Sequence, residues 1–167
     1  MKTVLRTAAA GLAIASLGLS SNAFAATATA DAEADIIAAL TVTLDTVNNR
    51  DALDFGTLAE SGAGGTITLT PAGSPTCGSG LVCAGPYNTP NFDIVGATGG
   101  TVNISLTSAN ITLTGPGTAM PLALTLSDVQ MVLDGTDSFD VGGTLTVGAN
   151  QAVGTYTGSM EVNVVYN

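Results

Sequence analysis

The sequence has few of the side chains on which most enzymes and nucleic-acid-binding proteins depend. It contains no His and no Trp, and three basic residues stand against thirteen acidic ones. General acid–base and nucleophilic catalysis usually recruit His, Lys or a free Cys beside carboxylates, so we expect no enzymatic activity and assign no catalytic residue. The acidic balance makes nucleic acid and anionic lipid surfaces poor partners. We also expect no cofactor.

The first 25 residues have the layout of a secretory signal peptide. A basic start precedes an apolar run at residues 8–19, and Ala23-Phe24-Ala25 is a cleavage site of the A-x-A kind. We therefore expect removal of residues 1–25 and a mature chain that begins at Ala26. The apolar run is too short for a permanent anchor, so no membrane span is expected after cleavage.

Cysteine is also scarce, because Cys77 and Cys83 are the only two in the chain. In a secreted chain this pair predicts a local disulfide that closes a small surface loop. A metal pair would need further soft ligands, which a chain without His or other Cys does not supply. The spacing also differs from a redox C-x-x-C motif.

The chain does contain many short stretches in which apolar and polar residues alternate, the pattern of half-buried strands. No stretch with a helical period follows Ala39. Residues 71–90 are rich in Pro and Gly and are predicted to form a long loop stapled by the disulfide. The pattern predicts an all-β protein, an immunoglobulin-like antiparallel β-sandwich over residues 38–167. Its strands are predicted at 36–44, 53–58, 66–70, 91–95, 101–106, 110–114, 122–126, 129–133, 139–147 and 154–167.

An N-terminal extension, residues 26–37, precedes this domain. Small apolar residues alternate with polar ones, so in an extended conformation one face carries the apolar set. A frayed Ala-rich helix or a mobile tail fits the same composition. The apolar set of the extension is Ala28, Ala30, Ala32, Ala34 and Ile36.

The last fourteen residues, 154–167, form the clearest alternating stretch. Met160, Val162, Val164 and Tyr166 recur at every second position, so a strand here buries one face and exposes the other. This strand needs a neighbour for its backbone groups, and the identity of that neighbour bears directly on function.

Two other segments contain residue types that bind ligands in some proteins, three aspartates for a metal ion and one tyrosine for a sugar. Asp134, Asp137 and Asp140 provide hard oxygen ligands for Ca²⁺, but they lack the EF-hand spacing and equally suit a solvated turn. Pro86-Tyr87-Asn88 offers one aromatic platform on which a sugar ring can stack. The sequence is compatible with calcium binding at the carboxylates and with a sugar stacked on Tyr87.

Three segments carry a resemblance to a known family: residues 53–58, residues 142–152 and the ending from Gly154 to Asn167. They resemble the bacterial family named domain of unknown function 4402, which is similar to the major subunits of Mat/Ecp-type fimbriae and to the spore-coat-U-like subunits of chaperone–usher pili. Pilins of that class end in an alternating strand with a penultimate Tyr and a Gly fourteenth from the end. Here these positions hold Tyr166 and Gly154.

The resemblance implies a pilin-like sandwich that lacks its final strand. A periplasmic chaperone strand first pairs beside the C-terminal strand, and the extension of a neighbouring copy later replaces it, which builds a head-to-tail fibre. An outer-membrane usher and secretion through the periplasm to the cell surface or an extracellular fimbria are implied with it. The donor strand would be the apolar set of the extension defined above. The polymerisation and chaperone strand would comprise Gly154, Tyr156, Gly158, Met160, Val162, Val164 and Tyr166.

Two features depart from that pattern, namely the alanine-rich extension and the short spacing of Cys77 and Cys83. The alternative is a self-complete secreted sandwich, in which residues 154–166 are an ordinary last strand and the protein binds a surface ligand or a glycan. The two functions differ in whether residues 26–35 are needed for assembly.

Overall fold

The structure, a computed structural model, describes residues 26–167, so the predicted signal peptide lies outside the described residues. Residues from Ile36 to Asn167 form one compact unit. Residues 26–35 are extended, without regular secondary structure, and every one of them is exposed. The described part of the chain holds no helix, and therefore none that could cross a membrane.

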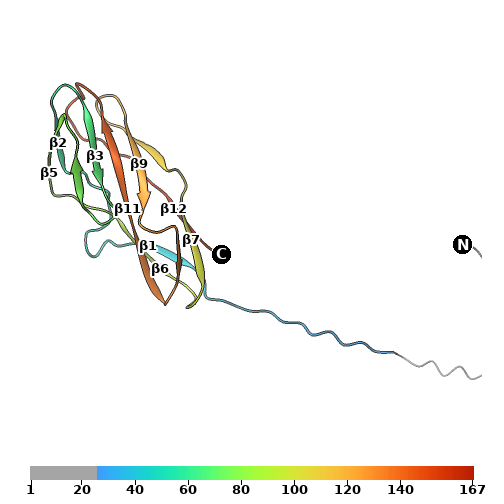
Figure 1. Ribbon diagram of the computed structural model, residues 1–167. Helices are drawn as coiled ribbons and strands as arrows, with labels where there is room; N and C mark the ends of the chain where they lie inside the picture. The colour runs from blue at the N-terminus through green and yellow to red at the C-terminus, as the bar shows by residue number, and fades with distance from the viewer. Residues whose placement is uncertain (1–25) are drawn as a thin grey trace, which may run out of the picture. The chain divides into compact units, whose positions relative to one another are not determined.

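The large sheet is built around β11 (Thr136–Val147) (Figure 1). The first half of β11 pairs with β6, which pairs in turn with β1. Its second half pairs with β9 and with β3, and these strands carry β8 and β4 at their outer edges. The other strands of this sheet are β1 (Thr41–Leu44), β3 (Gly65–Leu69), β4 (Pro75–Cys77), β6 (Asn91–Val95), β8 (Asn110–Leu113) and β9 (Met120–Leu126).

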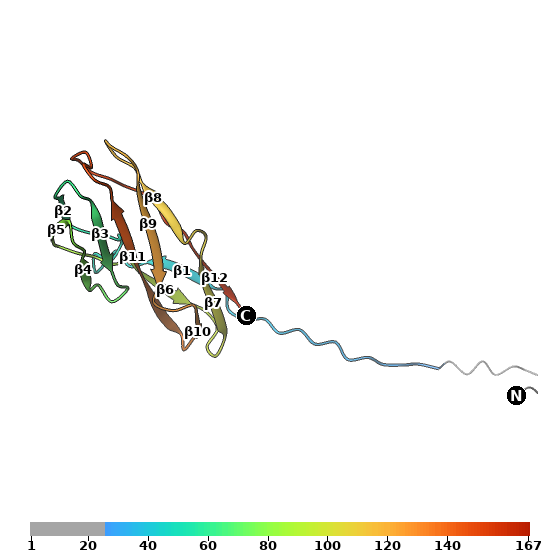
Figure 2. The same ribbon diagram turned by 45° about the horizontal axis from the view of Figure 1, so that its top comes forward.

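Two smaller sheets complete the domain (Figure 2). The first has the order β10-β7-β12 and comprises β10 (Gln130–Val132), β7 (Thr101–Leu106) and β12 (Val162–Tyr166). The second joins β2 (Thr57–Glu60) to β5 (Leu81–Ala84). Every strand pair in the described residues is antiparallel, as short connections and alternating sequences favour.

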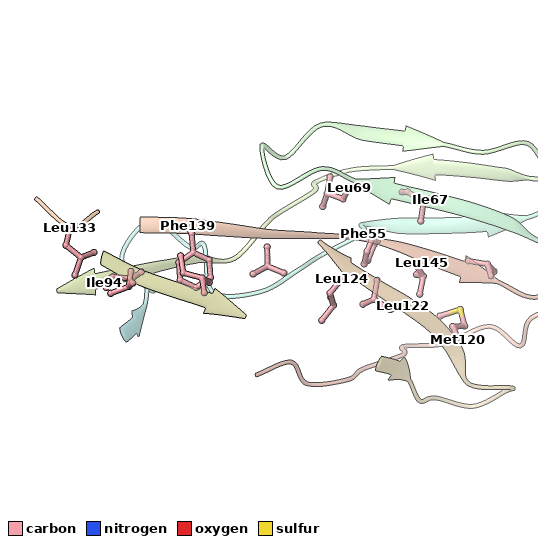
Figure 3. Close-up of a cluster of buried hydrophobic side chains, with 14 residues drawn as sticks. Phe55, Ile67, Leu69, Ile94, Met120, Leu122, Leu124, Leu133, Phe139 and Leu145 are labelled. Carbon is pink, nitrogen blue, oxygen red and sulfur yellow. The ribbon is translucent and has the colours of Figure 1, made fainter. Parts of the chain in front are cut away.

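The core lies between the sheets and follows β11 along its length. Figure 3 shows Leu133, Ile94 and Phe139 toward one end of this core, and Leu145 and Met120 toward the other. Alternation along each strand sends these side chains to the same side, where burial of each large apolar side chain contributes about 1.5–3 kcal/mol. The largest fully buried side chains are Phe139, Ile67, Leu69, Ile94, Leu133, Val102, Val141 and Pro90.

The predicted fold class is confirmed, since the described residues form an antiparallel β-sandwich. Three predicted strands begin several residues later than expected: the stretch 36–44 only at Thr41, the stretch 53–58 only at Thr57, and the stretch 154–167 only at Val162. The prediction of a single long loop at residues 71–90 is wrong, because β4 and β5 lie within it.

The disulfide between Cys77 and Cys83 is confirmed, with an S–S distance of 1.98 Å. Its setting differs from the predicted surface loop. Cys77 ends β4 on the edge of the large sheet, whereas Cys83 lies in β5 of the two-stranded sheet. The bridge therefore ties the β2–β5 sheet to the large sheet.

Candidate strand-binding groove

The C-terminal segment, Gly154–Tyr166, is bonded to other strands along one edge only. Its β12 portion pairs with β7, with Val164 opposite Ile104, and its earlier portion makes one isolated bridge, from Thr157 to Thr114, the residue that follows β8. Among the described residues no strand pairs with the other edge. A free edge beside an apolar surface is a template for strand addition.

The residues predicted for this segment alternate as expected. Tyr156, Met160, Val162, Val164 and Tyr166 are half-buried and pack against the core, while the residues between them are exposed. The two glycines of the set, at positions 154 and 158, are exposed. The segment therefore presents one apolar face inward and leaves its outer backbone edge free.

A groove lies along this free edge and consists of two adjoining cavities that share Leu53, Leu113 and Tyr156. The wide cavity, of about 650 Å³, lies between β2 and residues 151–156. The narrow cavity, of about 410 Å³, lies between the end of β1 at Leu44 and residues 156–160.

The floor of the groove is formed by apolar side chains from distant parts of the sequence. Phe92, Ile111 and Leu122 lie under the narrow cavity, and Met120, Leu145 and Val147 lie under the wide one. The described residues contain no group of three or more His, Cys, Asp or Glu side chains that could hold a metal ion. The groove thus offers hydrophobic contact and a row of backbone hydrogen-bonding groups, which suits a β-strand.

Tyr166 closes one end of the region between the C-terminal segment and β1. Its hydroxyl donates a hydrogen bond to the Ala38 carbonyl at 3.0 Å and accepts one from the Ala97 amide at 2.7 Å. The C-terminus and the residues leading into β1 accordingly lie side by side (Figure 1). A Cβ on Gly96 would lie 2.5 Å from this hydroxyl, so the contact depends on a glycine there.

Tyr156 makes a matching set of contacts ten positions earlier. Its hydroxyl accepts a hydrogen bond from the Gly117 amide and donates one to the Ala152 carbonyl, both at 2.9 Å. A Cβ on Gly117 would lie 2.6 Å from the hydroxyl. Because Tyr156 borders both cavities, its position decides where one cavity ends and the next begins.

The wall opposite the C-terminal segment is fixed by polar contacts that follow β1. Asp45 accepts hydrogen bonds from Asn48, and these bonds, chiefly the one from the Asn48 side chain, lower the pKa of the Asp45 carboxyl. Arg50 then forms an ion pair with Asp140 at 2.7 Å. The chain is thereby anchored to β11 before it passes along the groove.

The other sites considered from the sequence are not assembled. Asp140 is held by Arg50 and Asn91, while Asp137 accepts a hydrogen bond from the Asp134 amide. The carboxylates of Asp137 and Asp140, both within β11, therefore serve separate structural contacts. Tyr87 is half-buried and packs against the core, which leaves little of its ring for stacking on a sugar.

The predicted donor residues lie at the other end of the chain. Ala28, Ala30, Ala32 and Ala34 are exposed in the extended stretch. Ile36 is 98% exposed and Ile37 is 59% exposed, both unusual for large aliphatic residues. The described residues of its own chain leave most of this isoleucine pair uncovered.

Sequence reasoning found the C-terminal segment but missed the floor and the opposite wall. The wall residues Leu53 and Leu58 belong to a segment singled out for another reason, its resemblance to a family. Nothing in their spacing connects them with residues a hundred positions later, so only the topology brings them together.

The model of the family described as Domain of unknown function (DUF4402) matches residues 44–166. The chain belongs to this family. The matched range includes both walls and the floor of the groove, but excludes the extension. No curated protein and no solved structure shows a significant match.

Proposed function

We propose that the protein is a structural subunit of a fimbria or similar surface fibre, in which the groove takes a β-strand from another copy. One observation supports this most directly: the free edge of the C-terminal segment borders an apolar groove in a chain that also carries an exposed alternating extension. Strand addition satisfies the edge backbone groups and fills the groove together.

The extension of a second copy is the occupant that this chain itself supplies. Ten residues of the extension span roughly 33 Å when extended. Ten residues, 151–160, also line the groove on the side of the C-terminal segment. Groove and extension are different surfaces of the same chain, so the contact is heterologous and propagates into a filament.

Before assembly the groove is an exposed apolar surface beside a free edge, which promotes aggregation. We therefore include in the proposal a periplasmic chaperone that covers the groove and an outer-membrane usher that exchanges it for the extension. The product is a fibre at the cell surface.

Deletion of residues 26–35 tests the proposal. The intact secreted chain is compared with the deletion variant by light scattering and electron microscopy, with and without a synthetic peptide of residues 26–37. We expect filaments from the intact chain only, and we expect the peptide to raise the melting temperature of the deletion variant.

A peptide with Asp in place of Ala30 and Ala32 is the matched control, because it keeps the length and removes part of the apolar face. An intact chain that stays a stable monomer, and whose stability no peptide changes, contradicts the proposal. That result favours the self-complete sandwich that binds a surface ligand or glycan.

A further inference from the structure

We propose, as a refinement that rests on the fibre function above, a single register for the inserted strand. The extension of one copy runs antiparallel to the C-terminal segment of the next, with Ile36 opposite Gly154 and Ile37 opposite Val153. The groove determines the direction of the inserted strand, and the extension and the subunit junction determine its register.

The direction of the inserted strand follows from the groove being closed at its Tyr166 end. The Tyr166–Ala38 hydrogen bond joins the C-terminal segment to the residues that lead into β1, so each subunit's own extension begins at that end. A parallel insertion would bring Ile36 of one copy to the Tyr166 end of the next, where that copy's own Ala38 and Leu40 already lie. An antiparallel insertion brings it to the open end at Gly154, away from this obstruction.

The shape of the groove matches the same direction. The cavity near Gly154 has about 650 Å³ and the one near Met160 about 410 Å³, and the walls then meet at Tyr166. The extension has small alanines along its length and its first large inward residue, Ile36, at its base. Antiparallel insertion places the isoleucine beside the cavity of larger volume, and Ala30 and Ala32 beside the smaller one.

The alternation of both strands limits the register. Residues directly opposite in an antiparallel pair point to the same face, so the inward set of the extension must oppose inward positions of the segment. In the proposed register three alanines face the larger side chains of Val162, Met160 and Tyr156, which favours a donor rich in alanine. The pairs are Ala28 with Val162, Ala30 with Met160, Ala32 with Gly158, Ala34 with Tyr156 and Ile36 with Gly154.

Charge disfavours the register that is shifted by two residues in one direction. That shift places Asp31 opposite Glu161, and like charges directly opposite destabilise a strand pair. The proposed register places Asp31 opposite Ser159 instead. None of the carboxylates of the extension then faces another carboxylate across the pair.

Exposed apolar residues disfavour the register that is shifted by two residues in the other direction. That shift places Asp35 opposite Val153 and Ile37 opposite Gln151. The proposed register joins Ile37 to Val153, which are 59% and 95% exposed in the single chain, so each covers the other at the junction between copies.

Cysteine pairs in the full-length secreted chain test the register. The predicted pair is Ile37→Cys with Val153→Cys. Matched pairs combine Ile37→Cys with Gln151→Cys, Thr155→Cys or Val165→Cys, which report the two shifted registers and the parallel direction. The native Cys77–Cys83 bridge stays intact, and covalent oligomers are counted after denaturation without reductant.

We expect about tenfold more covalent oligomer from the Val153→Cys pair than from the other three. Directly opposite Cβ atoms are about 5 Å apart, whereas positions two residues away lie about 7–8 Å apart, beyond the reach of a disulfide. A maximum at Gln151→Cys or Thr155→Cys overturns the register, and a maximum at Val165→Cys overturns the direction.

The outcomes separate this inference from the function on which it rests. Filaments that form in all variants without any preferred cross-link contradict the register and leave the fibre function standing. An unmodified chain that forms no filaments removes the fibre function, and the register with it.

Discussion

β11 and the C-terminal segment are alternating stretches of similar length that end in different environments. In its second half β11 pairs with β9 on one edge and β3 on the other, and Val141 within it is fully buried. The C-terminal segment pairs on one edge, mainly through β12, and Val162 and Val164 are half-buried. Both sequences select one inward face, yet only β11 has neighbours on both sides.

The difference shows that alternation specifies which face is buried and leaves the edge partners unspecified. Partners come from whatever strands the topology places alongside. β11 is completed by its own chain, whereas the segment's second edge stays free in the single chain. If the proposed function holds, the segment reaches the burial of β11 only after a second copy adds its extension.

The largest effect is expected in β11. Val141→Asp should destabilise the domain by more than about 4 kcal/mol, because a carboxylate there has neither a partner nor access to water. The measurement is soluble yield with urea unfolding. Thr146→Asp, exposed on the same strand, is the control and should cost about 0.5 kcal/mol or less.

Val162→Asp makes the corresponding change in the C-terminal segment. It should lower the free energy of unfolding of the single chain by about 2 kcal/mol. A half-buried position beside a free edge lets the carboxylate reach water, so the penalty stays below that of Val141→Asp. Val165→Asp, on the outward face and 47% exposed, is the control. Urea unfolding and secretion are measured for both. An equal penalty for Val162→Asp and Val141→Asp would show that the segment's second edge is covered in the free chain.

Much of the fold was predictable because inward faces depend on local alternation. The stretches 101–106 and 122–126 were placed correctly, since their apolar residues recur at every second position. β4 and β5 were missed because Pro75 and the surrounding glycines indicate a loop. These strands exist through pairing with β3 and β2, which the local sequence does not reveal.

The start of β1 illustrates the same limit. Alternation begins at Ile36, but the ladder with β6 begins only at the pair Thr41 and Val95. In the groove, sequence identified the inward residues of the C-terminal segment. The contact of Tyr166 with Ala38 spans 128 positions, and no local pattern predicts it.

Gly117→Ala probes how the segment is held against its single neighbour. The new Cβ would lie 2.6 Å from the Tyr156 hydroxyl and 2.9 Å from the Ala152 Cβ, so we expect the free energy of unfolding, measured in urea, to fall by about 1–2 kcal/mol. Combining it with Tyr156→Phe removes the clashing oxygen, and the double variant should lose less than the sum of the two single losses. Gly148→Ala, whose Cβ would meet only the end of the Gln151 side chain, is the control. Strict additivity would contradict the packing of Tyr156 against Gly117.

The smallest effects are expected from the two tyrosine hydroxyls, and they distinguish the two ends of the segment. Tyr156→Phe and Tyr166→Phe each remove two hydrogen bonds to the backbone, and at half-buried positions we expect about 1 kcal/mol for each. Hydrogen exchange locates each loss: Tyr156→Phe should accelerate exchange of the Gly117 amide, and Tyr166→Phe that of the Ala97 amide. Each variant is the control for the other. If either substitution accelerated both amides equally, the two contacts would belong to one cooperative unit; separate responses mean that the segment is fixed independently at its two ends, with the free edge between them.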